Sequence, residues 1–374
     1  MPYRVYSRTG NARCCASTSC NGLLKKERTM PQIAIACQGG ALHAAFTAGA
    51  LKKILERQPD GQYDIIGLSG TSAGALCAVS VWYGLLTGGP AEAIKTLDGV
   101  WTDFAAVTPT ERAFNAWLVS SLRMQGYWMS ADVRFSPYAP FFPVMLAQLR
   151  LAGAREEFVD YTALLEKHID FEAVSQPGSQ PRLLIGAVNV LSGEFKAFDS
   201  AVPLPSKPEW SEISADAVRA SGAIPALGSR AVAIDGEIYW DGVYSQNPPI
   251  RNFLADPETA AAKPDEIWII QLNPTTRLSE PKTVADIQDR DNELAANLSM
   301  EQEKKFIADV NDWVEKGYLP PDKYKTVTVR TLKMSPEVSE PLDYASKLDR
   351  SQGFIAELMA HGGQQAELFL KDRG

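Results

Sequence analysis

The stretch Asp64–Leu76 constrains the fold of this chain more than any other. Its first half is a short apolar run that predicts a buried strand, and its last residues begin a helical pattern. Between them lies Gly70-Thr-Ser-Ala-Gly74, a G-x-S-x-G turn centred on Ser72, whose small neighbours let strand and helix pass close together. A helix N-terminus directly after the serine offers unpaired N–H groups to an anion. The stretch predicts a nucleophilic serine at a strand-to-helix elbow.

A second glycine-bearing turn precedes this elbow. The apolar run Gln32–Cys37 is typical of a parallel strand buried on both faces, and it leads through Gln38–Ala41 into a helical pattern over Ala44–Leu55. The alternation of strands and helices predicts an α/β fold, a three-layer α/β/α sandwich with a mostly parallel central sheet. Ligands of such sheets bind at the carboxyl ends of the strands, where both turns lie.

Residues 90–175 interrupt this alternation. They are rich in large apolar side chains and show no clean strand, which indicates a helical insertion or cap with amphipathic helices near Thr110–Met124 and Pro143–Phe158. Its aromatic residues either pack in the core, or line an apolar channel or touch a membrane. Later elements are expected as strands at Arg182–Val190, Glu194–Phe198, Glu237–Trp240, Glu266–Leu272 and Val327–Leu332, and as helices at 213–221, 284–316 and, as a pair, within 342–370. We expect a catalytic domain over 30–275 and a mainly helical C-terminal extension, 276–374, packed on it.

Charge is distributed unevenly along the 374 residues. The net charge is −8, yet residues 1–29 carry six Lys or Arg and one Glu, so the rest of the chain is more acidic than the whole. An acidic body gives no electrostatic case for binding nucleic acid. The uncharged stretch Ile65–Ala91 is long enough to span a bilayer, but its six glycines and its elbow favour a buried strand and helix, so we expect no transmembrane span.

The cysteines give no disulfide framework. Cys14, Cys15 and Cys20 lie in the basic leader without the spaced pairs of a zinc site, whereas Cys37 and Cys77 fall in apolar runs. Free cysteines without a disulfide framework are typical of a protein in a reducing compartment, so we expect the cytoplasm. The leader lacks the apolar core of a secretory signal, so we expect a disordered tail, the plainer alternative being that the working protein begins at Met30.

A nucleophilic serine needs a base, and histidine is nearly absent: the chain holds only His43, His168 and His361. Asp241 is the stronger candidate, because it closes an apolar strand and precedes a glycine, which puts its carboxylate at the strand-end edge where Ser72 emerges. In a semi-apolar cleft a carboxylate has a raised pKa and acts as a base directly. The alternative is an ordinary Asp-Gly turn.

Three separated motifs together resemble the patatin-like phospholipases. Their oxyanion motif G-G-G-x-R/K-G is similar to Gly39-Gly40-Ala41-Leu42-His43-Ala44, their G-x-S-x-G to Gly70–Gly74, and their D-G-G/A to Asp241-Gly242-Val243. Ala220–Pro225 is similar to the A-S-x-A-I-P stretch of bacterial members. The resemblance covers roughly residues 31–275, and the order and spacing of the motifs make it specific.

The resemblance implies a lipid acyl hydrolase with a Ser-Asp dyad, acting without metal or cofactor on a lipid or other acyl ester, with peripheral contact to a membrane surface. Asp241 would take the proton from Ser72, and backbone N–H groups of Gly39, Gly40 and Ala41 would form the oxyanion hole. The positions that support these motifs are His43, Gly70, Gly74 and Gly242.

Several residues depart from the family pattern. Ala41 replaces the third glycine, and it still supplies an N–H as long as its backbone does not need a positive φ. His43 replaces the basic residue only in part, because it is mostly neutral near pH 7. Ala44 replaces the last glycine, and Val243 crowds the dyad motif.

Three other functions stay open from the sequence. An α/β-hydrolase esterase would use Ser72, Asp241 and His361, although only about forty residues separate Met30 from Ser72, too few for the strands that usually precede that elbow. An acyltransferase would use the same serine with an alcohol or thiol acceptor. A catalytically weak lipid-binding protein would fit the altered oxyanion motif.

Overall fold

The computed structural model describes residues 30–128, 136–174, 178, 180–201, 212–225, 228–255 and 259–373. The strands are β1 Gln32–Cys37, β2 Asp64–Thr71, β3 Arg182–Asn189, β4 Phe195–Asp199, β5 Val232–Ile234, β6 Glu237–Asp241, β7 Glu266–Gln271 and β8 Thr328–Lys333. The helices are α1 Ala45–Arg57, α2 Ala73–Gly88, α3 Pro90–Phe104, α4 Pro109–Trp128, α5 Phe141–Leu151, α6 Glu156–Val159, α7 Tyr161–His168, α8 Phe171–Val174, α9 Ala215–Ser221, α10 Asn252–Ala255, α11 Val284–Glu315, α12 Pro336–Ser339 and α13 Gln352–Lys371. The expectations for residues 1–29, including the three leader cysteines, lie outside the described residues.

The strands form one mixed sheet in the order β5-β6-β3-β2-β1-β7-β8, with β4 paired to β3. The pairs β1–β2, β1–β7, β2–β3 and β7–β8 are parallel, whereas β4 and β6 run antiparallel to β3. The predicted mostly parallel α/β sheet is therefore confirmed. The late strand β8 joins the same sheet as the Ser72 strand.

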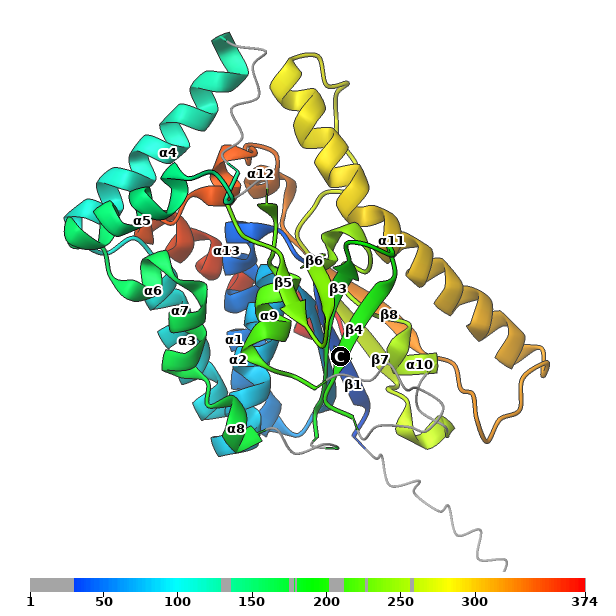
Figure 1. The fold of residues 1–374 in the computed structure, drawn as a ribbon. Helices are drawn as coiled ribbons and strands as arrows, with labels where there is room; N and C mark the ends of the chain where they lie inside the picture. The colour runs from blue at the N-terminus through cyan, green and yellow to red at the C-terminus, as the bar shows by residue number, and fades with distance from the viewer. Residues whose placement is uncertain are drawn as a thin grey trace, which may run out of the picture.

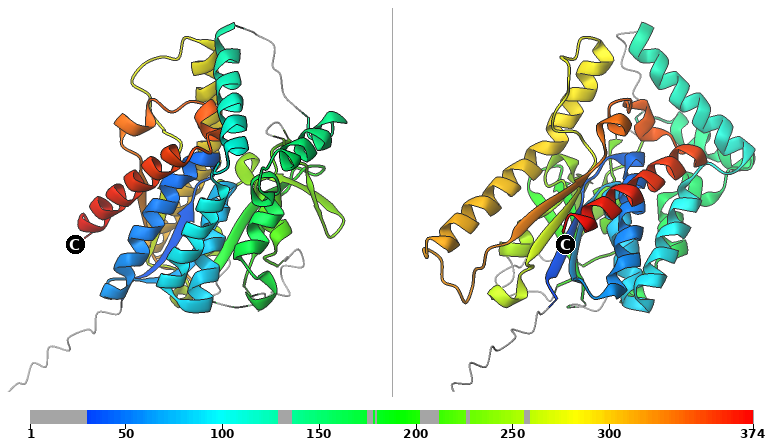
Figure 2. Two further views of the ribbon diagram at one scale, coloured as in Figure 1. Left: turned by 90° about the vertical axis from the view of Figure 1, so that its left-hand side faces the viewer. Right: turned by 180° about the vertical axis from the view of Figure 1, so that it is seen from behind.

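Helices cover both faces of the sheet (Figures 1 and 2). Alternate residues of β1 show this directly, because neighbouring side chains of a strand point to opposite faces. Ile33, Ile35 and Cys37 pack in one core with residues of α1, α2, α3 and α9, while Ala34 and Ala36 pack in a second core with residues of α10 and α11. The result is the expected three-layer α/β/α sandwich.

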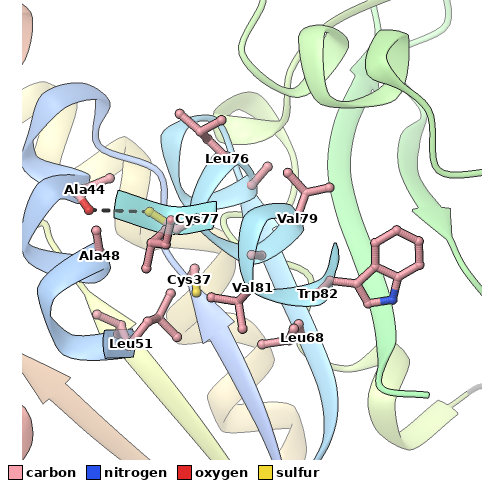
Figure 3. Close-up of a cluster of buried hydrophobic side chains, with 14 of the residues drawn as sticks. Cys37, Ala44, Ala48, Leu51, Leu68, Leu76, Cys77, Val79, Val81 and Trp82 are labelled. Carbon is pink, nitrogen blue, oxygen red and sulfur yellow. Dashed lines mark hydrogen bonds between the residues drawn. The ribbon is translucent and has the colours of Figure 1, made fainter. Parts of the chain in front are cut away.

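The larger core is built around α2, and it accounts for the uncharged stretch after the elbow. Figure 3 shows Leu76, Val79, Val81 and Trp82 of this helix among the side chains of the core. Cys77 is fully buried there, and its thiol donates a hydrogen bond to the Ala44 carbonyl oxygen at 3.6 Å. Every helix in the described part of the chain is too short or too polar to cross a membrane.

The insertion is helical, as expected, and its aromatic residues differ in their exposure to solvent. Trp101 of α3 is buried in the main core, whereas Trp117 of α4 and Phe141 of α5 are exposed. The helix expected over Pro143–Phe158 is two helices, α5 and α6, because Gly153 between them has a φ of +96°.

The end of the chain also differs from expectation. The pair of helices predicted within 342–370 is a single 3₁₀ turn, Ala345–Leu348, followed by α13. The Asp349 carboxylate accepts a hydrogen bond from the Ser351 N–H at 2.9 Å, a local turn that separates the two segments. Helix α13 then packs along α1, where an added Cβ on Gly49 would lie 1.8 Å from the Met359 carbonyl oxygen.

Candidate active site

The pairing of β3 brings Ser72 and Asp241 together. β2 pairs with β3 up to Thr71 opposite Gly186, and β6 ends at Asp241 opposite Ala187, the next residue along. Because β4 occupies the other edge of β3 over Leu184–Val188, β2 and β6 share one edge and meet end to end. The residue after β2 is Ser72, so the serine and the carboxylate lie at one point of the sheet, the carboxyl end of the parallel strands.

The backbone at Ser72 is bent as an elbow requires. Ser72 has a φ of +57° and a ψ of −131°, a conformation that an L-residue adopts only under constraint. The glycines on either side are required by space: a Cβ on Gly70 would lie 2.4 Å from the Gly74 carbonyl oxygen, and one on Gly74 would lie 2.3 Å from the Cys37 carbonyl oxygen. The predicted strand–turn–helix context of Ser72 is present.

Asp241 is completely buried beside this elbow. Its Oδ1 accepts a hydrogen bond from the Val243 N–H at 2.8 Å, while its Oδ2 has no partner with full hydrogen-bond geometry. Burial raises the pKa of Asp241 to about 7, and the nearby Ser72 hydroxyl and the Val243 N–H partly offset that rise. Gly242 lets the chain pass β3 closely, because a Cβ there would lie 2.4 Å from the Gly186 carbonyl oxygen. The carboxyl therefore titrates in the range of a base that works near neutral pH.

The segment Ala220–Pro225 joins the two halves of the site. Ser221, at the end of α9, accepts a hydrogen bond from the Ser72 N–H at 2.9 Å and donates one to the Gly186 carbonyl oxygen at 2.6 Å. Two residues later, the Ala223 carbonyl oxygen accepts the Asp241 N–H at 3.0 Å. The sequence identified this segment only by resemblance, and its contacts with both Ser72 and Asp241 come from the structure.

The glycine turn after β1 lies against the elbow, since a Cβ on Gly39 would be 3.0 Å from Cβ of Ser72. One of its three expected oxyanion donors is already engaged: the Gly39 N–H donates to Oδ1 of Asn247 at 2.7 Å. Across the described residues, no acceptor is recorded for the N–H groups of Gly40 and Ala41. Asn247, 208 positions away, takes the Gly39 N–H, so Gly40 and Ala41 are the expected donors that stay unengaged in the described structure.

Ala41 and His43 both differ from what the sequence suggested. Ala41 has a φ of +50°, the positive value that the prediction assumed it would avoid, so an alanine occupies a position that suits glycine. His43 is buried, and its Nε2 is 2.8 Å from Oγ of Ser346. Burial, with a smaller effect of Lys347, lowers the pKa of His43 to about 3. Near neutral pH His43 is therefore uncharged and supplies none of the motif's positive charge.

The other two histidines are engaged elsewhere. His361, on α13, accepts a hydrogen bond from the Ser335 N–H at 3.1 Å through Nε2, and its ring packs against Phe46. His168, in the insertion, has its Nε2 2.8 Å from Oδ2 of Asp103. Neither histidine contacts the Ser72 elbow in the described structure, so Asp241 is the candidate base.

The described residues contain no group of three or more His, Cys, Asp or Glu that could hold a metal ion. The sequence did not single out the buried amides around the glycine turn, Gln38, Asn247, Asn273 and Asn297. No local spacing marks them, because their partners lie far away in the sequence.

The three motifs of the site lie together in one region that a protein-family model matches. The model of the patatin-like phospholipases matches residues 35–254, which include the glycine turn, the elbow and Asp241. The chain belongs to this family. Membership of the patatin-like phospholipases confirms the resemblance and supports lipid acyl hydrolysis in general. The match favours this family over the α/β-hydrolase alternative, for which His361 would be the third residue.

Solved structures give more distant likenesses. VipD from Legionella pneumophila is 14% identical, with a TM-score of 0.39 over 92% of this chain and 67% of that one. A chain of the heterodimeric ExoU–SpcU complex from the type III secretion system of Pseudomonas aeruginosa is 13% identical, with a TM-score of 0.33 over 92% of this chain and 52% of that one. This patatin-like protein thus spans about two thirds of VipD and about half of the second chain. No match was found among curated proteins.

Proposed function

We propose that this patatin-like protein is a serine lipid acyl hydrolase in which Ser72 is the nucleophile and Asp241 the general base. The observation that carries the proposal is the pairing of a serine at a strained elbow with a fully buried carboxyl whose Oδ2 has no other partner. A buried carboxyl with a pKa of about 7 is half ionised at neutral pH, so it can both take and return a proton.

The reaction would run in two halves. Asp241 takes the Ser72 hydroxyl proton as Oγ bonds to the ester carbonyl carbon, and the N–H groups of Gly40 and Ala41 hold the negative charge on the carbonyl oxygen. The leaving alkoxide receives the proton from Asp241, which leaves an acyl-enzyme. Asp241 then takes a proton from water, the resulting hydroxide attacks the acyl carbonyl, and Ser72 is released with the proton from Asp241.

The test is hydrolysis of a p-nitrophenyl acyl ester series, with labelling by a fluorophosphonate probe alongside. We expect Ser72→Ala to lose both hydrolysis and labelling, and Asp241→Asn to lose hydrolysis while keeping the fold. A wild-type protein that is folded but hydrolyses no ester in the series contradicts the proposal. Product analysis with added alcohols or thiols distinguishes an acyltransferase, which would give transfer products in place of free acid.

Exposed apolar side chains favour a lipid surface as the source of substrate. The C-terminal half of α4 and the N-terminal half of α11 extend beyond the strand-end edge of the sheet (Figures 1 and 2). Trp117 and Met124 on α4, and Leu294 and Leu298 on α11, are each more than half exposed. Residues 294 and 298 are one helical turn apart and share a face of α11.

Phosphatidylcholine vesicles test this contact. We expect the double variant Met124→Glu and Leu294→Glu to lose binding to the vesicles and hydrolysis of vesicle lipid, while hydrolysis of a soluble short-chain ester is unchanged. Tyr318→Glu is the control, because Tyr318 is a large, exposed side chain that follows the opposite end of α11. Equal vesicle binding by all three proteins contradicts this role of α4 and α11.

A further inference from the structure

The peptide groups on both sides of Gly39 are held by buried asparagine side chains. Asn247 Oδ1 accepts the Gly39 N–H at 2.7 Å, and Asn273 Nδ2 donates to the Gly39 carbonyl oxygen at 3.2 Å. Both asparagines are almost completely excluded from solvent. These two bonds hold the peptide groups on either side of Gly39 beside Ser72.

The second of these bonds orients the next donor in the loop. The Gly39 carbonyl and the Gly40 N–H belong to one planar trans peptide, in which C=O and N–H point in opposite directions. Asn273 therefore directs the Gly40 N–H away from itself, and that N–H is one of the two without an acceptor in the described structure. Rotation of this peptide would turn the donor away from the position it now holds.

The asparagines are in turn fixed by helix α11, which belongs to the C-terminal part of the chain outside the matched family region. Asn247 Nδ2 donates to the Ala296 carbonyl oxygen at 3.1 Å, and the Asn247 N–H donates to Ser299 Oγ at 3.1 Å. Asn297 Nδ2 donates to the Asn273 carbonyl oxygen at 3.2 Å.

Gln38, directly after β1, connects the glycine turn with the end of β7 and with α11. Its Oε1 accepts the N–H groups of Leu272 and Asn273 at 2.8 and 2.9 Å, and its Nε2 donates to Asn297 Oδ1 at 2.8 Å. Gln38 is fully buried, so each of these bonds is made in a low-dielectric interior where a lost partner is costly. The amides form one connected network between β1, the end of β7 and α11.

We propose that Asn273 and Asn247 are positioning residues of the hydrolysis reaction, which act through Gly39 to orient the oxyanion donors, and that α11 holds them in place. The inference rests on the proposed function and deepens it, because it assigns a role in the site to a helix outside the matched family region. Neither asparagine touches the reacting atoms, so each affects the transition state through the glycine loop.

The test compares Asn273→Ala, Asn273→Asp and Asn247→Ala with the wild type. Displacing a catalytic group by about 1 Å costs about 100-fold in rate, so we expect kcat on a short-chain p-nitrophenyl ester to fall about 100-fold in each variant. Because the loop acts on the transition state, KM should change little. Asn273→Asp keeps the size of the side chain but removes the donor to Gly39, so it should be as slow as the alanine variant.

The matched control is Asn311→Ala on α11. Asn311 makes two comparable bonds to backbone, to the carbonyl oxygen and the N–H of Val327, both at 2.9 Å and remote from the elbow. We expect Asn311→Ala to lower the melting temperature about as much as Asn273→Ala but to leave kcat unchanged. Equal losses of kcat in the control and in the test variants would overturn the positioning role.

Hydrogen–deuterium exchange keeps this test independent of the proposed activity. The peptide covering residues 38–44 should exchange faster in Asn273→Ala and Asn247→Ala than in the wild type or Asn311→Ala. Unchanged exchange in this peptide overturns the inference, whether or not the wild type hydrolyses esters. A wild type that hydrolyses no ester, together with faster exchange in the two variants, overturns the proposed function alone.

Discussion

Replacing Asp241 with Asn should stabilise the fold while it abolishes hydrolysis. The substitution keeps the shape of the side chain and the oxygen that accepts the Val243 N–H. It removes a carboxylate that is completely buried and whose Oδ2 has no partner with full hydrogen-bond geometry. An ionised group in this position costs the folded state more than a neutral amide does.

The size of the effect follows from the pKa of Asp241, which burial raises from 3.8 to about 7. The protonated form favours folding, so the wild type loses stability as the pH rises from the unfolded pKa to the folded pKa, and the loss is constant above that range. At about 1.4 kcal/mol per pKa unit, the gain in Asp241→Asn is about 1.5 kcal/mol at pH 5 and about 4 kcal/mol at pH 8 to 9.

Urea unfolding of the two proteins at pH 5 and pH 9 measures this difference. We expect the stability gap to grow by about 2.5 kcal/mol between the two pH values. Asp216→Asn is the control, because this carboxylate on α9 is exposed and paired with Arg219. The difference in unfolding free energy between Asp216→Asn and the wild type should stay near zero at both pH values. In wild-type kinetics, kcat/KM should rise with pH through an apparent pKa of about 7. A gap that is the same at pH 5 and pH 9, or hydrolysis by Asp241→Asn at the wild-type rate, would refute the reasoning.

Three further substitutions, one of them with a matched control, test the backbone of the site. Ala41→Gly removes the Cβ from a residue with a positive φ, so the free energy of unfolding should rise by up to about 1 kcal/mol with no loss of kcat. A less stable variant would contradict the claim that the Ala41 backbone is strained. Gly74→Ala should lower the free energy of unfolding by about 3 kcal/mol, because its Cβ would lie 2.3 Å from the Cys37 carbonyl oxygen. The control Gly353→Ala, with open space on α13, should raise the free energy of unfolding by about 1 kcal/mol. Urea unfolding measures both changes. Ser221→Ala removes the acceptor of the Ser72 N–H and a donor to the Gly186 carbonyl oxygen. We expect the free energy of unfolding to fall by about 2 kcal/mol and kcat to fall as well. An unchanged kcat would show that Ser221 has no influence on the elbow.

The architecture could be predicted because the signals for it are local. Gln32–Cys37 and Glu266–Gln271 are apolar except at their polar end residues, as is typical of parallel strands buried on both faces, and both lie inside the sheet. The elbow was visible because small residues are required on both sides of Ser72. The boundary errors occurred where a single turn decides the outcome, at Gly153 and at Asp349.

The sequence by itself determined the sheet, the elbow and the two candidate reacting groups, since burial periodicity and turn chemistry are written in neighbouring residues. Only the tertiary structure decided how the groups around them are used. Asn247 reaches Gly39 across 208 positions, and burial makes His43 neutral. These outcomes depend on which polar atoms remain without water when distant segments pack, and no local pattern of residue types specifies that.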